Sequence, residues 1–393
     1  MKHSFEVQKF TQIPFDGILA KKVLNMQKII DRLIKIWHWF DPLFPEQDIY
    51  TKRLSFRYSI VALLILTIVI TLLASLMPLN EYIGFDWTHF WGKQNIPAFY
   101  PPWTVYLVKF ITYPMLIGIT IASFIIATYQ RSNHMLSSLA ALLSFPLIWT
   151  VFLGQLEGWT VLGMLYLPWL IPMVLVKPQV SVFGLGARRS YIIAFFIFFC
   201  LSLLFWGNWP AKMFAITTYY SGDDYPQDIG LGIMGLPIFL SMLWFSRGDM
   251  DMLMACGAFI SPHLVFYNLL PLTPAVARLK PGKAIIAMLI SFTPLLSNWL
   301  GEKGWLFGWG FVFWLWVNLA IQRYPNMQLT RWIKKKRFPF LMDSKTLHHF
   351  SDSGGHKRTR STRMAHELWI GIRIFFHIFL TNIYIHAKIA HEV

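Results

Sequence analysis

Residues 58–77, YSIVALLILTIVITLLASLM, form an apolar run that contains no acidic or basic side chain. A helix of about 20 residues spans the roughly 30 Å hydrocarbon layer of a membrane, so this run predicts a transmembrane helix. Similar runs recur along the chain, in which 55% of the residues are hydrophobic and only 14% are charged. Soluble domains carry about 25% charged residues. Since the short alternating segments of a membrane β-barrel are not evident, the composition predicts an all-α polytopic membrane protein.

The net charge of +16 is concentrated at the two ends of the chain and in short loops. In membrane proteins this distribution marks cytoplasmic segments and contact with anionic lipid, so we expect both termini to be cytoplasmic and expect no nucleic-acid partner. Counting the apolar runs, among them 104–129 and 160–176, gives about 9–11 transmembrane helices.

Three regions are predicted along the chain. Residues 1–56 form a cytoplasmic region with an amphipathic interfacial helix at 19–40, where apolar residues recur at helical spacing among lysines and arginines. Residues 57–322 form the transmembrane domain. Residues 323–393 form a basic cytoplasmic tail, in which an interfacial helix is favoured over a further span.

Residues 250–277 form an apolar stretch that is broken by Ser261-Pro262-His263 and by two later prolines. A single crossing would leave Arg278, Lys280 and Lys283 outside, against the charge distribution, so two short segments running out and back are favoured. This path brings His263 to the outer face. An ionisable side chain at such a break indicates a functional site, with a structural histidine as the alternative.

The outward-facing loop at 84–103, GFDWTHFWGKQNIPAFYPPW, contains the residues best suited to chemistry. The carboxylate of Asp86 can act as a general base toward an incoming hydroxyl group. His89 lies three positions later and would share a face with Asp86 in a helical segment. The alternative is that Asp86 is a solvated or helix-capping residue.

Other polar residues near the ends of the apolar runs are candidates to bind substrate. Gln155 and Glu157 lie in a tight outer hairpin, where they either orient a polar ligand or are solvated turn residues. Lys109 and Lys212 are candidates to hold a phosphate, although Lys109 could equally extend to the lipid headgroups. Lys177, which precedes a proline, fits an anchor at the end of a membrane run.

The sequence gives no reason to expect a resident metal or cofactor. Asp223, Asp224 and Asp228 could bind a divalent cation, but an acidic loop facing water explains them equally well. Cys200 and Cys256 both fall in apolar runs, and neither a zinc motif nor a nucleotide-binding motif occurs.

The order of these motifs resembles glycosyltransferase family 87, the polyprenol-phosphate-mannose-dependent mannosyltransferases of the GT-C superfamily. The shared features are an Asp in the first outer loop followed by aromatic-Pro-Pro-Trp, a Gly-Gln turn with a later Lys-Pro-Gln, and the Ser-Pro-His. They fall between residues 80 and 270. The N-terminal helix and the tail lie outside the resemblance.

The resemblance implies a GT-C-like helical bundle in the plasma membrane. It implies inverting transfer of a sugar, expected to be mannose, from a polyprenyl-phosphate carrier to a lipid or glycan acceptor on the outer face. Asp86 would then be the general base, and His263 would lie near the donor phosphate.

Two functions of other classes stay open. Broken helices suit a transporter or flippase for a lipid-linked or polar solute, but no inverted repeat is visible and the polar residues gather at one face. The other function that stays open is that of a non-catalytic membrane assembly subunit.

Overall fold

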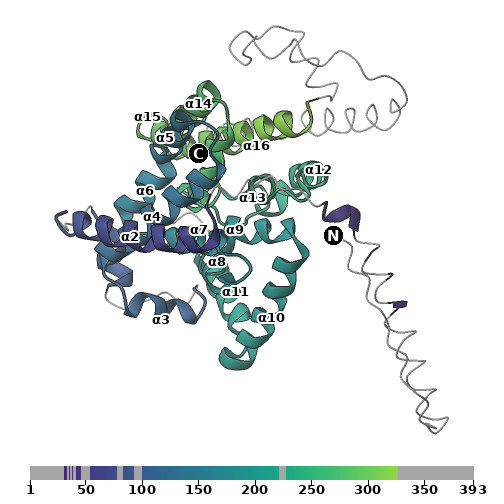
Figure 1. The fold of residues 1–393 in the computed structure, drawn as a ribbon, viewed down its shortest axis with the longest axis horizontal. Helices are drawn as coiled ribbons and strands as arrows, with labels where there is room; N and C mark the ends of the chain where they lie inside the picture. The colour runs from purple at the N-terminus through teal and green to yellow at the C-terminus, as the bar shows by residue number, and fades with distance from the viewer. Residues whose placement is uncertain are drawn as a thin grey trace, which may run out of the picture. The chain divides into compact units, whose positions relative to one another are not determined.

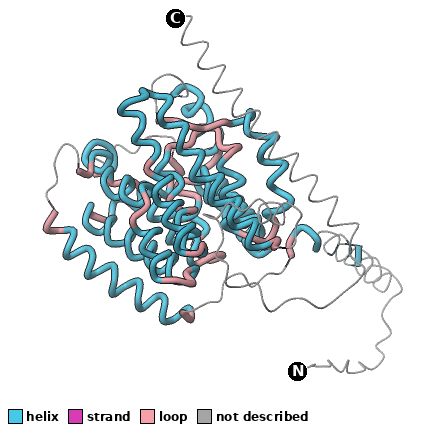
Figure 2. Tube along the Cα trace, turned by 90° about the horizontal axis from the view of Figure 1, so that it is seen from above, coloured by secondary structure: helices cyan, strands magenta, loops and turns pink. Residues whose placement is uncertain are grey.

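The computed structural model describes residues 54–77, 83–92, 100–220 and 227–325, together with residues 31, 32, 35, 38 and 41–45. Within these residues every regular element is a helix and no strand occurs (Figure 2). The chain forms two units, Met1–Pro45 and Glu46–Val393. The first contains the short helix η1 (Asp41–Leu43), where Asp41 pairs with His38. Most of the interfacial helix predicted at 19–40, and the whole of that in the tail, lie outside the described residues.

The larger unit is built from helices of 4 to 19 residues joined by short turns (Figure 1). Its α-helices are α2 (Phe56–Ala74), α3 (Trp103–Lys109), α4 (Tyr113–Arg131), α5 (Met135–Leu142), α6 (Phe145–Leu153), α7 (Glu157–Leu165), α8 (Ile171–Val174), α9 (Pro178–Gly184), α10 (Arg189–Trp206), α11 (Trp209–Tyr220), α12 (Leu236–Ser246), α13 (Met250–Ala258), α14 (Pro281–Ser291), α15 (Ser297–Leu300) and α16 (Trp309–Arg323). The tighter or wider turns are η2 (Trp87–Trp91), η3 (Leu185–Ala187), η4 (Gly232–Gly235), η5 (Phe266–Leu269), η6 (Thr273–Arg278), η7 (Thr293–Leu296) and η8 (Gly301–Gly308).

Among the described residues, four helical segments are long and apolar enough to cross a membrane: α2, α4, α10 and the stretch Pro281–Arg323. The bent pair α5 and α6 makes a fifth if it is counted as one span. In the most apolar 18 residues of α2, and in the 18 residues of α10, only 6% are buried inside the protein. Apolar surfaces of this extent require lipid rather than water around them, so the chain is a multi-pass membrane protein.

Two runs that were predicted to be single spans are divided in the structure. The run at 104–129 is split into α3 and α4, and the run at 160–176 is split into α7 and α8. Each interruption lies beside a proline: Pro114 is in the first turn of α4, and Pro168 lies between α7 and α8. Proline has no N–H to donate to the carbonyl group four residues earlier, and its ring crowds that carbonyl, so the preceding helix cannot continue through it.

Residues 249–278 run out and back, as was predicted for the stretch at 250–277. Helix α13 follows Asp249, and η6 ends at Arg278 after the turn that contains His263. The Arg278 guanidinium lies 2.9 Å from Asp249 Oδ2 and 2.8 Å from Asp251 Oδ2. The end of the stretch therefore contacts its beginning, so the chain returns to the place from which it started, and the two short crossings stay a prediction.

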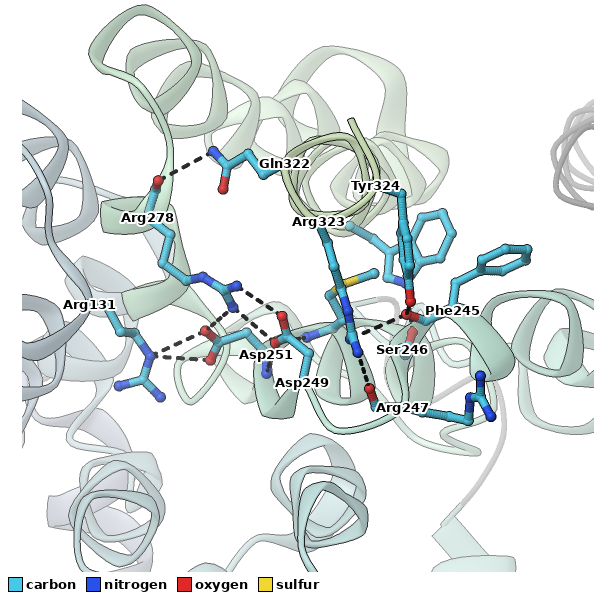
Figure 3. A network of polar contacts seen from close by, with 12 residues as sticks. Arg131, Phe245, Ser246, Arg247, Asp249, Asp251, Arg278, Gln322, Arg323 and Tyr324 are labelled. Atoms are coloured by element: carbon cyan, nitrogen blue, oxygen red, sulfur yellow. Dashed lines mark hydrogen bonds and ion pairs between the residues drawn. The ribbon is translucent and has the colours of Figure 1, made fainter. Parts of the chain in front are cut away.

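We call Arg131, Asp249, Asp251 and Arg278 the Asp249 cluster (Figure 3). Arg131 Nε, at the end of α4, donates to Asp251 Oδ1 at 3.2 Å. Asp249 Oδ1 also caps α13 by accepting the backbone N–H groups of Asp251 and Met252. All four carboxylate oxygens therefore accept hydrogen bonds, and both aspartates are fully buried. The cluster ties together the ends of α4, α13 and η6.

Helix α16 closes the same end of the bundle (Figure 3). Gln322 Nε2 donates to the carbonyl oxygen of Arg278, and the Arg323 guanidinium donates to the carbonyl oxygens of Phe245 and Arg247. Arg131, Arg247 and Arg278 thus gather at one end, as expected from their predicted location on one side of the membrane.

Candidate functional site

The loop that contains Asp86 is attached to the end of α6. Gly84, with φ of 76°, donates its N–H to the carbonyl oxygen of Phe152 at 2.8 Å. Trp87 packs on Tyr113 at the start of α4, with 6.4 Å between ring centroids. Asp86 precedes η2, but its side chain makes no capping hydrogen bond to that turn. The helix-capping alternative is therefore wrong.

Gln155 reaches Asp86 from the turn between α6 and α7. Its Nε2 donates to Asp86 Oδ2, and only 5% of the residue is exposed. Gly154 makes this turn with φ of 76°, and a Cβ atom there would lie 2.9 Å from the Tyr113 ring and 3.0 Å from Trp87 Cβ. Only glycine combines this backbone conformation with so little space, so Gly154 fixes the direction in which Gln155 points.

Glu157 is buried at the start of α7, with 1% of the residue exposed. The next residue, Gly158, packs so closely on α4 that a Cβ atom would lie 2.0 Å from Thr120 Oγ1. Glu157 Oε1 accepts from Asn268 Nδ2 at 2.8 Å, whereas Oε2 has no partner among the described residues. Their burial shows that Gln155 and Glu157 are not solvated turn residues.

Lys177 joins these groups from the turn between α8 and α9. Its Nζ lies 2.7 Å from Glu157 Oε1 and also donates to Gln155 Oε1. The ammonium lies 4.6 Å from the ring centroid of Tyr267 and 5.5 Å from that of Tyr100, where cation–π attraction adds to the ion pair. With a side chain only 2% exposed, Lys177 is not an anchor in the headgroup region.

We call Asp86, Gln155, Glu157, Lys177 and Asn268 the Asp86 cluster. Burial raises the pKa of Asp86 to about 6, although the charge of Lys177 opposes this rise. For Lys177, burial alone would lower the pKa, but the carboxylate of Glu157 outweighs it and the pKa is raised. Two carboxylates and one ammonium leave the cluster with one net negative charge. A half-buried carboxylate that titrates near neutral pH is suited to accept a proton from a substrate.

Three of the other predicted residues have no hydrogen bond or ion pair to the described members of the cluster. His89 is exposed, stacks on Phe85 and lies with Nδ1 2.8 Å from the carbonyl oxygen of Phe85. Lys109, at the end of α3, and Lys212, on α11, are exposed.

His263 pairs with Asp228 instead of Asp86. Its Nδ1 lies 2.6 Å from Asp228 Oδ2, while Asp228 Oδ1 accepts the N–H groups of Gly230 and Leu264, both at 2.8 Å. Burial would raise the pKa of Asp228, but these hydrogen bonds outweigh it and the pKa is lowered. No hydrogen bond or ion pair joins His263 to Asp86, although Asn268 on the same broken segment contacts Glu157.

A cation site built from three aspartates finds no support in the described residues. Asp223 and Asp224 lie outside them, and Asp228 is engaged by His263. In the part of the chain that the structure describes, no group of three or more His, Cys, Asp or Glu side chains could hold a metal ion.

Two members of the cluster were missed by sequence reasoning. Lys177 was interpreted as an anchor, and Asn268 was not singled out. The signal available was that each is a strongly polar residue beside apolar runs, where such residues are costly without partners. No known protein family, curated protein or solved structure matches the chain, so the resemblance to family 87 rests on the motif residues alone.

Proposed function

We propose that the protein is a membrane glycosyltransferase that transfers a sugar from a polyprenyl-phosphate carrier to a hydroxyl group of a lipid or glycan acceptor. The observation that carries the proposal is the half-buried Asp86 carboxylate. It accepts a hydrogen bond from Gln155, which in turn accepts one from Lys177 of the buried Lys177–Glu157 pair. A transferase of this kind needs little more from the protein than a base, a grip on the phosphate and correct orientation of the substrates.

In the proposed reaction the acceptor oxygen attacks the anomeric carbon of the sugar. The bond from that carbon to the phosphate oxygen breaks, the lipid phosphate leaves with the electron pair, and Asp86 takes the hydroxyl proton. Oδ2 of Asp86 is held by Gln155, which leaves Oδ1 for the acceptor hydroxyl. Attack from the face opposite the phosphate inverts the anomeric configuration.

The donor phosphate requires positive charge or hydrogen-bond donors outside the Asp86 cluster, because Glu157 already neutralises Lys177. We assign this role to His263, as the resemblance to family 87 implies. Asp228 holds the His263 imidazole through Nδ1, and Asn268, five positions further along the same segment, touches Glu157.

The proposal includes a GT-C-like bundle with about 9–11 membrane segments, in which short helices add to the four or five long ones. Both termini would be cytoplasmic, the membrane would be the plasma membrane, and the sugar would be mannose. The end of the bundle with the Asp249 cluster and Arg247 would face the cytoplasm, and the Asp86 cluster would face the outer side.

The test is transfer of labelled mannose from a polyprenyl-phosphate donor in membranes that contain the wild-type protein or Asp86→Asn. We expect the variant to lose about 100-fold to 10,000-fold in rate, because the general base is removed. Glu302→Gln, which changes an exposed acid in η8, is the matched control and should retain full transfer. Undiminished transfer by Asp86→Asn at equal expression would overturn the assignment of the base.

A transporter or flippase is the second candidate, favoured by the buried Lys177–Glu157 ion pair within a membrane domain. Proteoliposomes that contain labelled donor lipid distinguish the two functions. Movement of the donor between leaflets without any covalent transfer would support the transporter.

A further inference from the structure

The amide of Gln155 lies between a cation and a carboxylate, and this fixes its orientation. Lys177 has only donors to offer, and an ionised Asp86 has only acceptors. Gln155 therefore accepts from Lys177 through Oε1 and donates to Asp86 through Nε2. The reverse orientation would place oxygen against the carboxylate and N–H against the ammonium.

The position of the Lys177 ammonium is itself fixed on the side away from Gln155. Glu157 Oε1 contacts Lys177 Nζ at 2.7 Å and is held in turn by Asn268 at 2.8 Å. The Tyr267 ring lies 4.6 Å from the ammonium. Since both charged side chains are at most 2% exposed, solvent screens them little, and their charges act on Asp86 at close range.

The titratable and charged groups that act on Asp86 come from three neighbouring elements and from η2 itself. They are His89 on η2, Glu157 on α7, Lys177 before α9 and Tyr267 on η5. Lys177 is the cation that favours an ionised Asp86 most, and Glu157 is the anion that opposes ionisation. The two members of one ion pair thus act on Asp86 in opposite directions.

We propose that Lys177 and Glu157 are positioning residues: Lys177 orients the Gln155 amide toward Asp86, and the two charges together set the pH range in which Asp86 accepts a proton. The inference deepens the proposed function, since that pH range matters for catalysis only if Asp86 is the base. The charge effect itself is independent of the reaction and can be measured without it.

The experiment measures how readily the Asp86 carboxyl is esterified by a diazo reagent as the pH is varied. The reagent consumes the protonated carboxyl, and mass spectrometry of the Asp86 peptide gives the midpoint. The full-length protein in detergent is compared with Lys177→Met and with Glu157→Gln. Removing the cation should raise the midpoint by about one pH unit, and removing the anion should lower it by a smaller amount.

Two further variants keep the test decisive. The double variant Glu157→Gln with Lys177→Met buries no unpaired charge, so it should fold even if Lys177→Met does not. Its midpoint should still rise, by less than that of Lys177→Met, because the effect of Lys177 is the larger of the two. Lys303→Met removes an exposed lysine of η8 and should leave the midpoint unchanged.

The proposal is overturned if the midpoint of the double variant does not rise, or if Glu157→Gln raises it. A purely structural role would not shift the two charge variants in opposite directions. The pH profile of transfer separates this result from the proposed function. If the labelling midpoints shift in opposite directions but the wild type transfers no sugar, the charge effect is supported and the proposed transferase function is rejected. If transfer depends on Asp86 but the midpoints do not move, the transferase function is supported and the charge effect is rejected.

Discussion

Among the described residues, the Asp249 cluster and the Asp86 cluster differ in how completely their buried polar groups are paired. Helix α4 has 19 residues, a length of about 28 Å, with the Asp86 cluster near its start and the Asp249 cluster at its end. In the Asp249 cluster two arginines balance two aspartates, and every carboxylate oxygen accepts a hydrogen bond. In the Asp86 cluster the charge is unbalanced, and Glu157 Oε2 has no partner among the described residues.

This difference separates a network that holds the fold from one that costs stability. A buried network whose members are all satisfied rigidifies the structure, whereas an incompletely paired one destabilises it. Chains retain such costly groups where they serve a function. The comparison leads us to expect that the Asp249 cluster contributes to stability, and it supports the proposal that the Asp86 cluster serves catalysis. Each prediction below tests one of these two expectations.

The largest effect on stability is expected for Asp251→Ala in the Asp249 cluster. The change removes the carboxylate that Arg131 and Arg278 share, and breaking a buried ion pair in this way costs about 3–5 kcal/mol. Chemical unfolding in detergent measures the loss. The control Glu302→Ala, at an exposed acid, should change the unfolding free energy by less than about 0.5 kcal/mol. An equal, small effect of both changes would mean that the cluster does not hold the fold.

The helical membrane class could be predicted from the sequence because apolar runs and charge distribution are local properties. The return of the stretch 250–277 to its starting end was predicted on the same grounds. The number of long spans was not, because the prolines near α4 and α8 divide runs that are continuous in composition. The described residues contain four spans, or five with the bent pair.

Part of the candidate site could also be predicted. Asp86, Gln155 and Glu157 were all singled out, and the structure brings them together. Asn268 was missed because its partner Glu157 lies 111 positions away, and sequence patterns report neighbours within about one helical turn. The pairing of His263 with Asp228 was missed for the same reason.

Gly158→Ala tests how α7 positions the Asp86 cluster, and we expect it to lower the free energy of unfolding by less than Asp251→Ala does. The added methyl group would meet Thr120 Oγ1 at 2.0 Å and Thr120 Cα at 2.7 Å, so α7 must move away from α4. Overpacking of this kind costs about 1–3 kcal/mol. It should also lower transfer, because Glu157 moves with the helix.

Gly282→Ala is the matched control for this change. A Cβ atom at Gly282, in the first turn of α14, meets no atom within 4 Å. Since alanine favours a helix by about 1 kcal/mol over glycine, this variant should be neutral or slightly more stable. Thermal unfolding of both variants in the same detergent measures the difference. Equal midpoints for the two would show that the close approach of α7 to α4 is not needed.

The smallest effect on the free energy of unfolding is expected for Asp86→Asn, and this change should stabilise the protein. Because burial raises the pKa of Asp86 to about 6, the folded protein holds this proton more tightly than the unfolded chain, whose carboxyl titrates near pH 4. The stability that the protonated carboxyl contributes is complete below about pH 4 and is lost as the pH rises to about 6.

Asparagine does not titrate, so the free energy of unfolding of Asp86→Asn should increase by about 1–2 kcal/mol relative to the wild type as the pH rises over this range. Unfolding midpoints of the two proteins between about pH 4 and pH 8 measure the gain, and a difference that does not change with pH would contradict it. A variant that is more stable but inactive would show that the ionised Asp86 carboxylate lowers the stability of the fold and is needed for activity.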